Sequence, residues 1–454
     1  MAEVCLQSVQ QKRLSSLSLL GLLFALGYAY LAVQSKTLLT LAPTLTILIT
    51  FSLLLFSYWY YLKWGNHQPT FAEIFLWAVV FRSIALVGEP ILEDDFYRYL
   101  WDGFTLVTYG SPYGIAPEAY FDAEGVPALM QSTLDGINNP HIATIYGPVN
   151  QLIFALGYLI APGQVWPLQL IFALFDLGVI YLLKGLTSHR NILLYAWSPL
   201  LIKEFAFTAH PDVMAVFFLL AASLCFLKHK PQWLGAFAAL AVASKVFALV
   251  AIPLLLLRSI RAWLYFTIVL VCLYLPFADS LFFANSEHGF NAMSSGWFFN
   301  APLYLLFAEY LFTLKLLTAL SFIGLWCWLA AKFIFAEQMV KVGLFEGEAT
   351  EQRVHLPRMD YLFAGLLLLG PVLNPWYWVW VLAFAAIWPS IWAWLTSLAL
   401  LLSYIIGLHL ESLTLGAYQH PNWGVVAEFG LVGLGFILSS KSVQQLLFKR
   451  LGRH

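Results

Sequence analysis

The sequence predicts an all-α fold, a polytopic transmembrane helical bundle, and three observations support this prediction. The chain has 454 residues, of which 61% are hydrophobic and only 10% are charged, whereas soluble domains carry about 25% charged residues. Its mean hydropathy is +0.78. Its apolar residues come in runs of about 17–25, the length of a helix that crosses a hydrocarbon core of about 30 Å. Such runs are too long for barrel strands, and a helix satisfies its own backbone in lipid.

The predicted spans number about 12–14, counted as apolar runs of helical length. The runs extend over residues 14–33, 39–62, 70–88, 166–184, 190–206, 211–227, 232–245, 246–257, 262–277, 311–334, 359–374, 376–389, 391–409 and 422–440. We expect them to form a single integral membrane domain over residues 1–454.

Basic residues in short loops predict the orientation, because cytoplasmic loops carry an excess of lysine and arginine. Lys12 and Arg13 predict a cytoplasmic N-terminal segment. Further basic turns lie at residues 63, 184–190, 228–230, 258–261, 341–358 and 441–453. The stretch 89–141 differs, because it holds nine carboxylates and a single basic residue, Arg98. We therefore expect this stretch to be extracytoplasmic.

The extracytoplasmic loop is predicted to extend over residues 89–162 and to contain juxtamembrane helices. Its run 146–161 is apolar enough to span, but a crossing there would place Lys184 and Arg190 outside. We interpret this run as a re-entrant or interfacial helix, and the sequence leaves a true span open. A second extracytoplasmic loop is expected at 278–302, and a cytoplasmic connector at 335–358.

Composition also argues against several kinds of site. The formal net charge is −1, so there is no basic footprint for nucleic acid. The four cysteines form neither a disulfide framework nor a metal-ligand spacing. No glycine-rich phosphate loop follows a predicted strand, which argues against a Rossmann-like nucleotide-sugar domain. We predict no metal and no cofactor.

An acidic and aromatic cluster, EDDFYRYLWDG at residues 93–103, directly follows a predicted span. Asp95 and Asp102 are seven residues apart and would share a helix face. Asp94 and Arg98 are four apart, a spacing at which an arginine can hold a carboxylate ionised. The functional interpretation is a general base with a partner that positions a substrate or binds a cation; the alternative is an ordinary solvated loop. The interleaved aromatic residues, which include Tyr99 and Trp101, favour the functional one because they suit the membrane interface and the stacking of sugar rings.

Two further motifs complete a recognisable order: GSPY, which ends at Tyr113, and TIYGP, which contains Tyr146. Together with the acidic cluster, they resemble polyprenyl-phosphate-sugar-dependent glycosyltransferases of the GT-C superfamily, especially mannosyltransferase-like members. Gly147 stands where the first of two prolines is usual in that family. The resemblance covers most of the chain in layout, and its specific motifs are confined to about residues 94–148. It implies a GT-C-like bundle with a large first extracytoplasmic loop.

Other polar and aromatic residues map to the same predicted side. They are His210, Asp212, Lys245, Asn300, Asn374, Trp376 and Tyr377. Each has a structural alternative: His210 as a satisfied helix-end histidine, Asp212 as a helix cap, Lys245 as a snorkelling lysine and the tryptophans as an aromatic belt. In the functional interpretation Lys245 or Arg98 meets a lipid-linked phosphate, while the remaining residues contact substrate.

The resemblance implies transfer of a hexose, mannose-like, or of a pentose from a polyprenyl-phosphate donor to a lipid or glycan acceptor. Asp94 or Asp95 would act as the base in an inverting single displacement, and such enzymes generally need no metal. We expect the protein in a bacterial inner membrane, among membrane lipids, with an extracytoplasmic site and no nucleic-acid partner. A lipid or solute transporter or flippase is the alternative, and a non-catalytic assembly subunit is a third reading.

Overall fold

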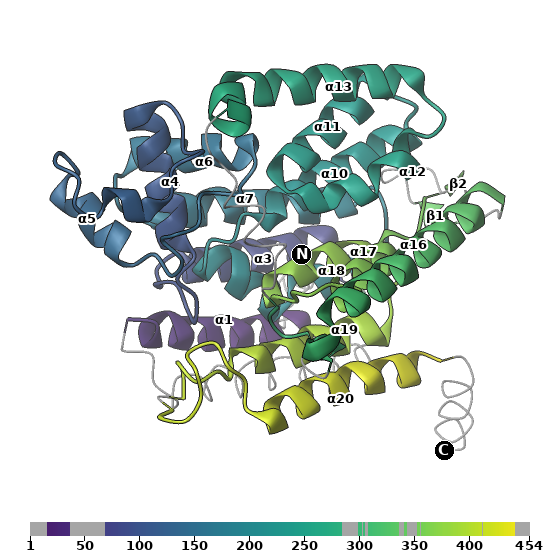
Figure 1. The fold of residues 1–454 in the computed structure, drawn as a ribbon. Coiled ribbons are helices and arrows are strands. Elements are labelled where there is room, and N and C mark those ends of the chain that lie inside the picture. Colours follow the sequence, from purple (N-terminus) through teal and green to yellow (C-terminus); the bar gives the residue numbers. More distant parts are fainter. Residues whose placement is uncertain are drawn as a thin grey trace, which may run out of the picture.

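The computed structural model describes residues 16–36, 69–283, 298–301, 303–304, 307–335, 340–342, 352–354, 356–410 and 412–440. The predicted span 39–62, Lys12, Arg13, Lys63 and the basic tail lie outside these residues, as does most of the predicted connector 335–358. The described part of the chain is almost entirely helical, which confirms the all-α class (Figure 1). Its strands, β1 (Val340–Val342) and β2 (Gln352–Val354), pair as a short antiparallel hairpin within the predicted connector.

The α-helices are α1 (Ser16–Gln34), α3 (Phe71–Ala85), α4 (Phe96–Tyr109), α5 (Ala128–Asp135), α6 (Pro148–Ile160), α7 (Trp166–Leu183), α8 (His189–Ala196), α9 (Pro199–Ile202), α10 (Asp212–Leu227), α11 (Pro231–Ser244), α12 (Ile252–Leu256), α13 (Ile260–Tyr274), α16 (Leu311–Phe335), α17 (Met359–Leu369), α18 (Val379–Ala385), α19 (Ile391–Ala399) and α20 (Asn422–Ser439). Short 3₁₀ turns are η1 (Pro117–Tyr120), η3 (Val246–Val250), η4 (Leu275–Phe277), η6 (Ala308–Tyr310), η7 (Pro375–Trp378) and η8 (Leu400–Tyr404), and π-helical turns are η2 (Lys203–Phe207) and η5 (Asp279–Phe283).

Five described helices are long and apolar enough to cross a membrane, or six if one bent pair counts as a single span. They extend over Leu17–Gln34, Trp166–Leu183, Ile260–Phe277, Leu311–Phe335 and Asn422–Ser439. Helices α7, α10, α11 and α13 pack side by side in sequence order, with α19 against α20 and α1 against α3 (Figure 1). These features support a helical membrane protein.

The expected count of about 12–14 uninterrupted spans is not reproduced by the described helices. The predicted runs 190–206, 246–257 and 376–389 are each broken into short helical pieces. Pro199 begins a new helix inside the first run, and Pro253 lies inside the second. Proline lacks the N–H of the helical ladder and clashes with the preceding turn, so an apolar run that contains it need not be one helix.

The bent pair consists of Pro199–Phe207 and α10, whose axes meet at 115°. The break lies at residues 208–211, where Ala209 has a φ of +61°. A non-glycine residue rarely adopts this left-handed conformation, which must be held by its surroundings. The break therefore orients the following residue, His210, in a way that a continuous helix would not.

A buried ion pair fixes α3 to α7 at the side of the bundle. Arg82 donates from Nε to Asp176 Oδ2 at 2.8 Å, and both side chains are at most 1% exposed. Tyr195 of α8 donates to the other carboxylate oxygen at 2.8 Å, and the carbonyl of Ala196 accepts from Arg82 at 2.9 Å. A buried ion pair is costly to break from one side, so this cluster rigidifies the scaffold that carries the loop 89–95.

The first loop carries its own small apolar core, formed by Trp101, Phe104, Met130, Leu134 and Ile137. Helix α6 packs on α4, where a Cβ on Gly103 would lie 2.3 Å from the carbonyl oxygen of Phe154. Gly103 therefore permits this close approach. At 13 residues α6 is shorter than the about 20 that span a bilayer; its placement relative to the membrane stays a prediction.

Candidate functional site

A cavity of about 260 Å³ lies where the first loop meets the C-terminal part of the chain. Four segments far apart in sequence line it: the turn before α4, the turn after α5, Phe299, and the region from Asn374 to Tyr418. Its lining residues are Leu92, Glu93, Asp94, Asp95, Asn138, Asn139, Phe299, Asn374, Trp376, Ser403, Tyr404, Ile406, Leu408, His409 and Tyr418. Of the residues predicted from the sequence, four are brought together here: Asp94, Asp95, Asn374 and Trp376.

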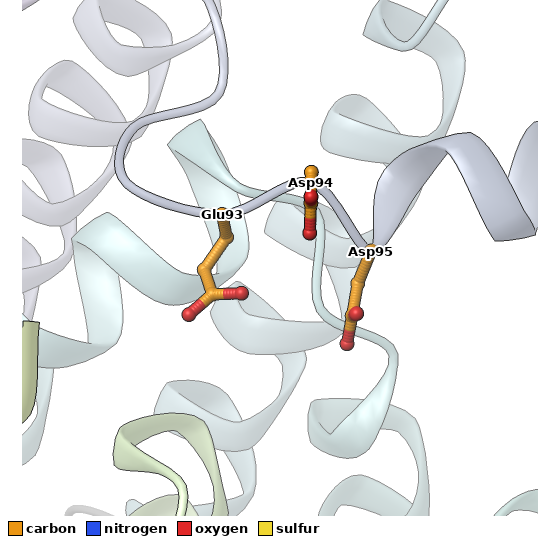
Figure 2. A group of neighbouring side chains, drawn as sticks. All are labelled: Glu93, Asp94 and Asp95. Carbon is orange, nitrogen blue, oxygen red and sulfur yellow. The ribbon is translucent and has the colours of Figure 1, made fainter. Parts of the chain in front are cut away.

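Three consecutive carboxylates form one wall of the cavity. Glu93, Asp94 and Asp95 extend to the same side of the backbone (Figure 2), and one oxygen of each lies within 4.8 Å of the others. The preceding Leu92 has a φ of +63°, and strained backbone of this kind clusters at ligand sites. Oxygen ligands at such separations suit a hard cation such as Mg²⁺, so the geometry permits a metal that the sequence analysis did not predict.

Asn138 joins two of these carboxylates. Its Nδ2 donates to Asp94 Oδ1 at 2.9 Å and to Asp95 Oδ1 at 3.2 Å. Asp95 stands at the N-cap of α4 but makes no capping hydrogen bond with its side chain, although aspartate commonly caps there. The Asp95 carboxylate therefore lines the cavity and does not cap the helix. Glu93 accepts no hydrogen bond from any residue that the structure describes.

Burial raises the pKa of all three acids. The pKa of Asp95 rises to about 6, because burial and the neighbouring Asp94 charge outweigh the Asn138 hydrogen bond and the more distant cations. Burial also raises the pKa of Asp94, against the Asn138 hydrogen bond, and raises that of Glu93 well above its ordinary value. A carboxyl with a pKa near the working pH is suited to general base catalysis.

The predicted pairing of Arg98 with Asp94 is wrong. The Arg98 guanidinium instead donates to the backbone carbonyls of Ile142 and Asn139, both at 2.7 Å. Both carbonyls belong to the turn that carries Asn138, so Arg98 anchors this turn to α4. The i,i+4 spacing permits the predicted pair, but the guanidinium instead bonds backbone carbonyls of the turn after α5.

A second group of predicted residues surrounds Lys245. Its Nζ lies 3.3 Å from Asp212 Oδ2, and its side chain is 14% exposed. The ammonium also lies over the ring of Tyr377 at 4.6 Å and that of Tyr146 at 5.7 Å. Lys245 is thus held by a carboxylate and by aromatic faces, partners that neither the predicted phosphate contact nor the alternative of a snorkelling lysine included. Asp212 is the first residue of α10 and follows the N-cap residue Pro211, and its carboxylate accepts from Lys245 and Trp380, which contradicts its interpretation as a simple helix cap.

His210 links this group to the cavity wall. Its ring stacks on Trp376 with centroids 3.9 Å apart, and its Nδ1 lies 3.1 Å from the hydroxyl of Tyr99. The Tyr146 hydroxyl donates to that of Tyr99 at 3.5 Å. A continuous line of polar and aromatic contacts therefore runs from Trp376 in the cavity to Tyr146 beside Lys245.

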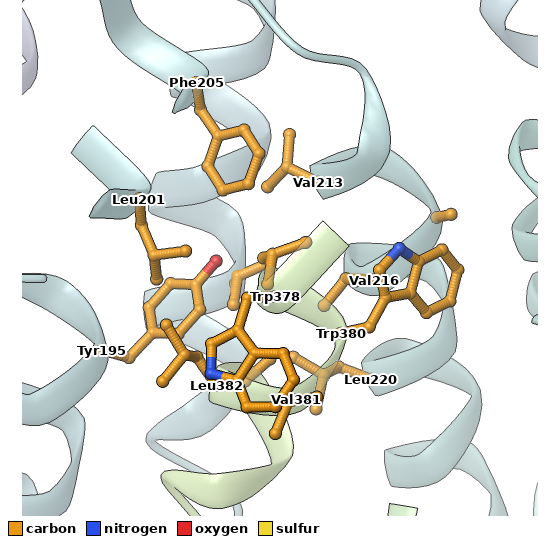
Figure 3. Packing of buried hydrophobic residues seen from close by; sticks show 14 of the residues in the cluster. Tyr195, Leu201, Phe205, Val213, Val216, Leu220, Trp378, Trp380, Val381 and Leu382 are labelled. Carbon is orange, nitrogen blue, oxygen red and sulfur yellow. The ribbon is translucent and has the colours of Figure 1, made fainter. Parts of the chain in front are cut away.

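The tryptophans after Asn374 do not form an aromatic belt at the lipid surface. Trp378 and Trp380 are fully buried among residues of α8, α9 and α10 (Figure 3). Trp380 donates from Nε1 to Asp212 Oδ1 at 3.1 Å, and Trp378 donates to the carbonyl of Ala393 at 2.8 Å. Trp380 thus supports Asp212 through a hydrogen bond, and the burial of both tryptophans contradicts the belt interpretation for the described part of this segment.

Other predicted contact residues lie away from the cavity. Trp101 is 2% exposed in the core of the first loop. Asp102 is equally buried and accepts hydrogen bonds from Thr144 and Gln151. It was predicted to share a helix face with Asp95, but it does not line the cavity with Asp95. Tyr113 donates to the carbonyl of Tyr146 at 2.9 Å. These three residues hold the first loop together.

Asn300 is 2% exposed and has a φ of +51°. It donates to Glu428 Oε1 at 2.6 Å and to the carbonyl of Leu373 at 3.2 Å. Backbone hydrogen bonds between Phe299 and residues 371–373 place it beside the cavity wall. Asn300 therefore positions Phe299 instead of lining the cavity itself.

Sequence reasoning missed a buried ion pair behind the cavity. Lys203 Nζ lies 3.1 Å from Glu204 Oε2 and donates to the hydroxyl of Tyr404 at 2.6 Å. Tyr404 in turn donates to Glu204 Oε1 at 2.6 Å. The signal was present, because a Lys-Glu dipeptide inside an apolar run is expensive and marks a functional or structural pair. It was not recognised because residues 190–206 were predicted to be one membrane-spanning helix.

Comparisons with family models, curated proteins and solved structures found no match. The fold and the site therefore define this protein as a helical membrane protein with an acidic, aromatic-lined cavity.

Proposed function

We propose that this protein is a membrane glycosyltransferase that uses a sugar linked through phosphate to a polyprenol. The single observation that best supports the proposal is the pair Asp94 and Asp95, joined by Asn138 at the wall of a cavity. The raised pKa of Asp95 and its position at the cavity wall support a role as the base that accepts a proton from an acceptor hydroxyl. The proposal also includes three finer assignments. The sugar is a mannose-like hexose or a pentose, the site is extracytoplasmic, and the membrane is a bacterial inner membrane.

The proposed reaction is a single displacement at the anomeric carbon. Asp95 or Asp94 takes the proton of the acceptor hydroxyl as its oxygen bonds to that carbon. The bond from the anomeric carbon to the phosphate oxygen breaks, and polyprenyl phosphate leaves with the electron pair. The anomeric configuration is inverted because attack and departure are on opposite faces.

Lys245 is the proposed contact for the donor phosphate. Its ammonium lies among Asp212, Tyr377 and Tyr146, and it influences the ionisation of Asp95. A phosphate near Lys245 would therefore leave the anomeric carbon between the cation and the acids. Charge-assisted hydrogen bonds to phosphate are strong, and they stabilise the leaving group as negative charge develops on it.

A transporter or flippase remains the second candidate, and one observation favours it. The pair Pro199–Phe207 and α10 is broken at 115°, and the buried Lys203 and Glu204 lie beside the break. Broken helices with buried charges are typical of transporter binding sites. The transferase is favoured because the acids that line the cavity are in the loop before α4 and not on the broken pair.

The test uses purified protein in lipid nanodiscs with radiolabelled polyprenyl-phosphate sugars and a panel of acceptors. Asp94→Asn and Asp95→Asn keep side-chain volume and remove charge; at one of them turnover should fall about 10²–10⁴-fold. Asp122→Asn, an exposed acid of the same loop, is the matched control and should retain turnover. Near-normal transfer by both cavity variants contradicts the assignment. Movement of intact labelled lipid between leaflets, without transfer, would support the transporter instead.

A chelator arm addresses the metal. Turnover that survives EDTA agrees with a metal-free base. Turnover that is abolished by EDTA and restored by Mg²⁺ or Mn²⁺ would instead assign Glu93, Asp94 and Asp95 as cation ligands.

A further inference from the structure

The lining of the cavity is acidic. Among the described lining residues, three are carboxylates and none is a lysine or an arginine. The nearby cations have other partners: Lys203 is buried against Glu204 and Tyr404, Arg98 is held by two carbonyls, and Lys245 is paired with Asp212. An anionic group in the cavity would approach the carboxylates of Asp94 and Asp95, and no lysine or arginine among the described lining residues would offset the repulsion between like charges.

The remaining wall offers what a neutral, hydroxyl-rich ligand needs. Aromatic rings come from Phe299, Trp376, Tyr404 and Tyr418, and amides come from Asn139 and Asn374. A carboxyl group accepts hydrogen bonds when it is ionised and can also donate one when it is protonated, so hydroxyl groups are its natural neutral partners in either state. No described residue donates to Glu93, so this carboxyl group can bind a ligand hydroxyl.

We propose that this cavity takes an uncharged saccharide, which serves as the acceptor, and that it excludes the phosphorylated donor end. The acceptor and the donor phosphate then approach Asp95 from different sides, the acceptor through the cavity and the phosphate from Lys245. The role of the saccharide as an acceptor rests on the proposed function. The selectivity of the cavity for neutral saccharide follows from its wall alone.

Tyr418 gives the sharpest variant, because it lines the cavity and is 49% exposed, so its removal leaves the core intact. Tyr418→Ala should raise the KM for a neutral glycan acceptor about tenfold, equivalent to about 1.4 kcal/mol, with the donor KM unchanged. The matched control is Trp423→Ala, an aromatic residue of α20 that is 60% exposed and does not line the cavity. It should change neither constant.

Direct binding separates this inference from the proposed function. Calorimetry in EDTA compares methyl α-mannoside and mannobiose with mannose 6-phosphate and inorganic phosphate, and we expect measurable binding of the neutral sugars only. Leu408→Lys adds a cation at an exposed lining position and should admit mannose 6-phosphate, whereas Leu408→Gln should not. The protein could bind sugar, lose that binding in Tyr418→Ala, and still be inactive with every donor tested. This result would support the saccharide site in the cavity and contradict the proposed transferase activity.

Four outcomes would overturn the inference. They are equal binding of neutral and phosphorylated sugars, sugar or phosphate binding that appears only with Mg²⁺, tighter binding of mannosamine than of mannose, and a Tyr418→Ala effect confined to the donor KM. In the last case transfer itself would persist, so the proposed function would stand while the assignment of the cavity would fall.

Discussion

Asn138 Nδ2 lies 2.9 Å from Asp94 Oδ1, although the two residues are 44 positions apart in the chain. The same nitrogen donates to Asp95, and the side-chain oxygen Oδ1 of Asn138 accepts from Asn139 Nδ2 at 3.0 Å. The side-chain amide is therefore fixed at both ends, with its turn anchored by Arg98. One amide thus orients both candidate bases.

Asn138→Ala should lower turnover more than it lowers stability. Without the amide the two carboxylates lose their shared donor and their orientation, and misplacement of about 1 Å in a catalytic group can reduce the rate about 100-fold. We expect a fall in kcat of about 10–100-fold with little change in donor KM. Gln131→Ala, at a half-buried position of α5 that does not line the cavity, serves as the control. Wild-type kcat in Asn138→Ala would show that the carboxylates hold their positions without it.

The pH profile should report the base. Asp95 must be ionised to accept a proton, and its pKa is raised to about 6 by burial and by Asp94. The ionised fraction rises with pH, so kcat should fall as pH drops through about 6, and not near the ordinary value of about 4. Measurement of kcat from pH 4.5 to 8.5 tests this. Full activity at pH 5 would exclude Asp95 as the base with this pKa.

Lys245→Met should weaken donor binding because it keeps most of the side-chain length and removes the charge. We expect apparent donor affinity to fall about tenfold or more, worth about 1.4 kcal/mol, with a smaller change for the acceptor. The matched control is Lys230→Met, an exposed lysine at the other end of α11. Unchanged donor affinity would assign Lys245 to the Asp212 ion pair alone.

Arg82→Met should destabilise the scaffold by about 3–5 kcal/mol, because it leaves Asp176 buried without its cation. Arg261→Met, at an exposed position of α13, should change stability by less than about 0.5 kcal/mol. Denaturation in detergent, followed by tryptophan fluorescence, compares the two. Equal midpoints would mean that the Arg82 pair adds nothing to the fold.

The predicted topology places the loop 89–141 outside and the turn 228–230 inside. With the four native cysteines replaced, Glu118→Cys should react with an impermeant thiol reagent on intact cells, and His229→Cys only after lysis. Both positions are exposed, so accessibility within the protein is not limiting. The reverse pattern would place the cavity on the cytoplasmic side.

The sequence by itself determined the class of protein and the location of its acids. Its long apolar runs exclude a soluble fold, and the adjacent charges of Asp94 and Asp95 are a local property that any fold must accommodate. Local patterns of this kind are readable because burial of charge is costly wherever the chain goes.

Only the tertiary structure decided which hydrogen-bond and ion-pair partners the site residues have. Arg98 was expected to bind Asp94 but holds a turn more than 40 residues away, and Asp212 was a candidate cap but pairs with Lys245. Asn138 bonds the acids, and Tyr418 and His409 line the same cavity, all from segments with no sequence signal of their own. Spacing along a helix limits which neighbours a side chain can reach. Which of the available donors it bonds depends on long-range packing, and packing also decides where an apolar run breaks, as at Pro199 and Ala209.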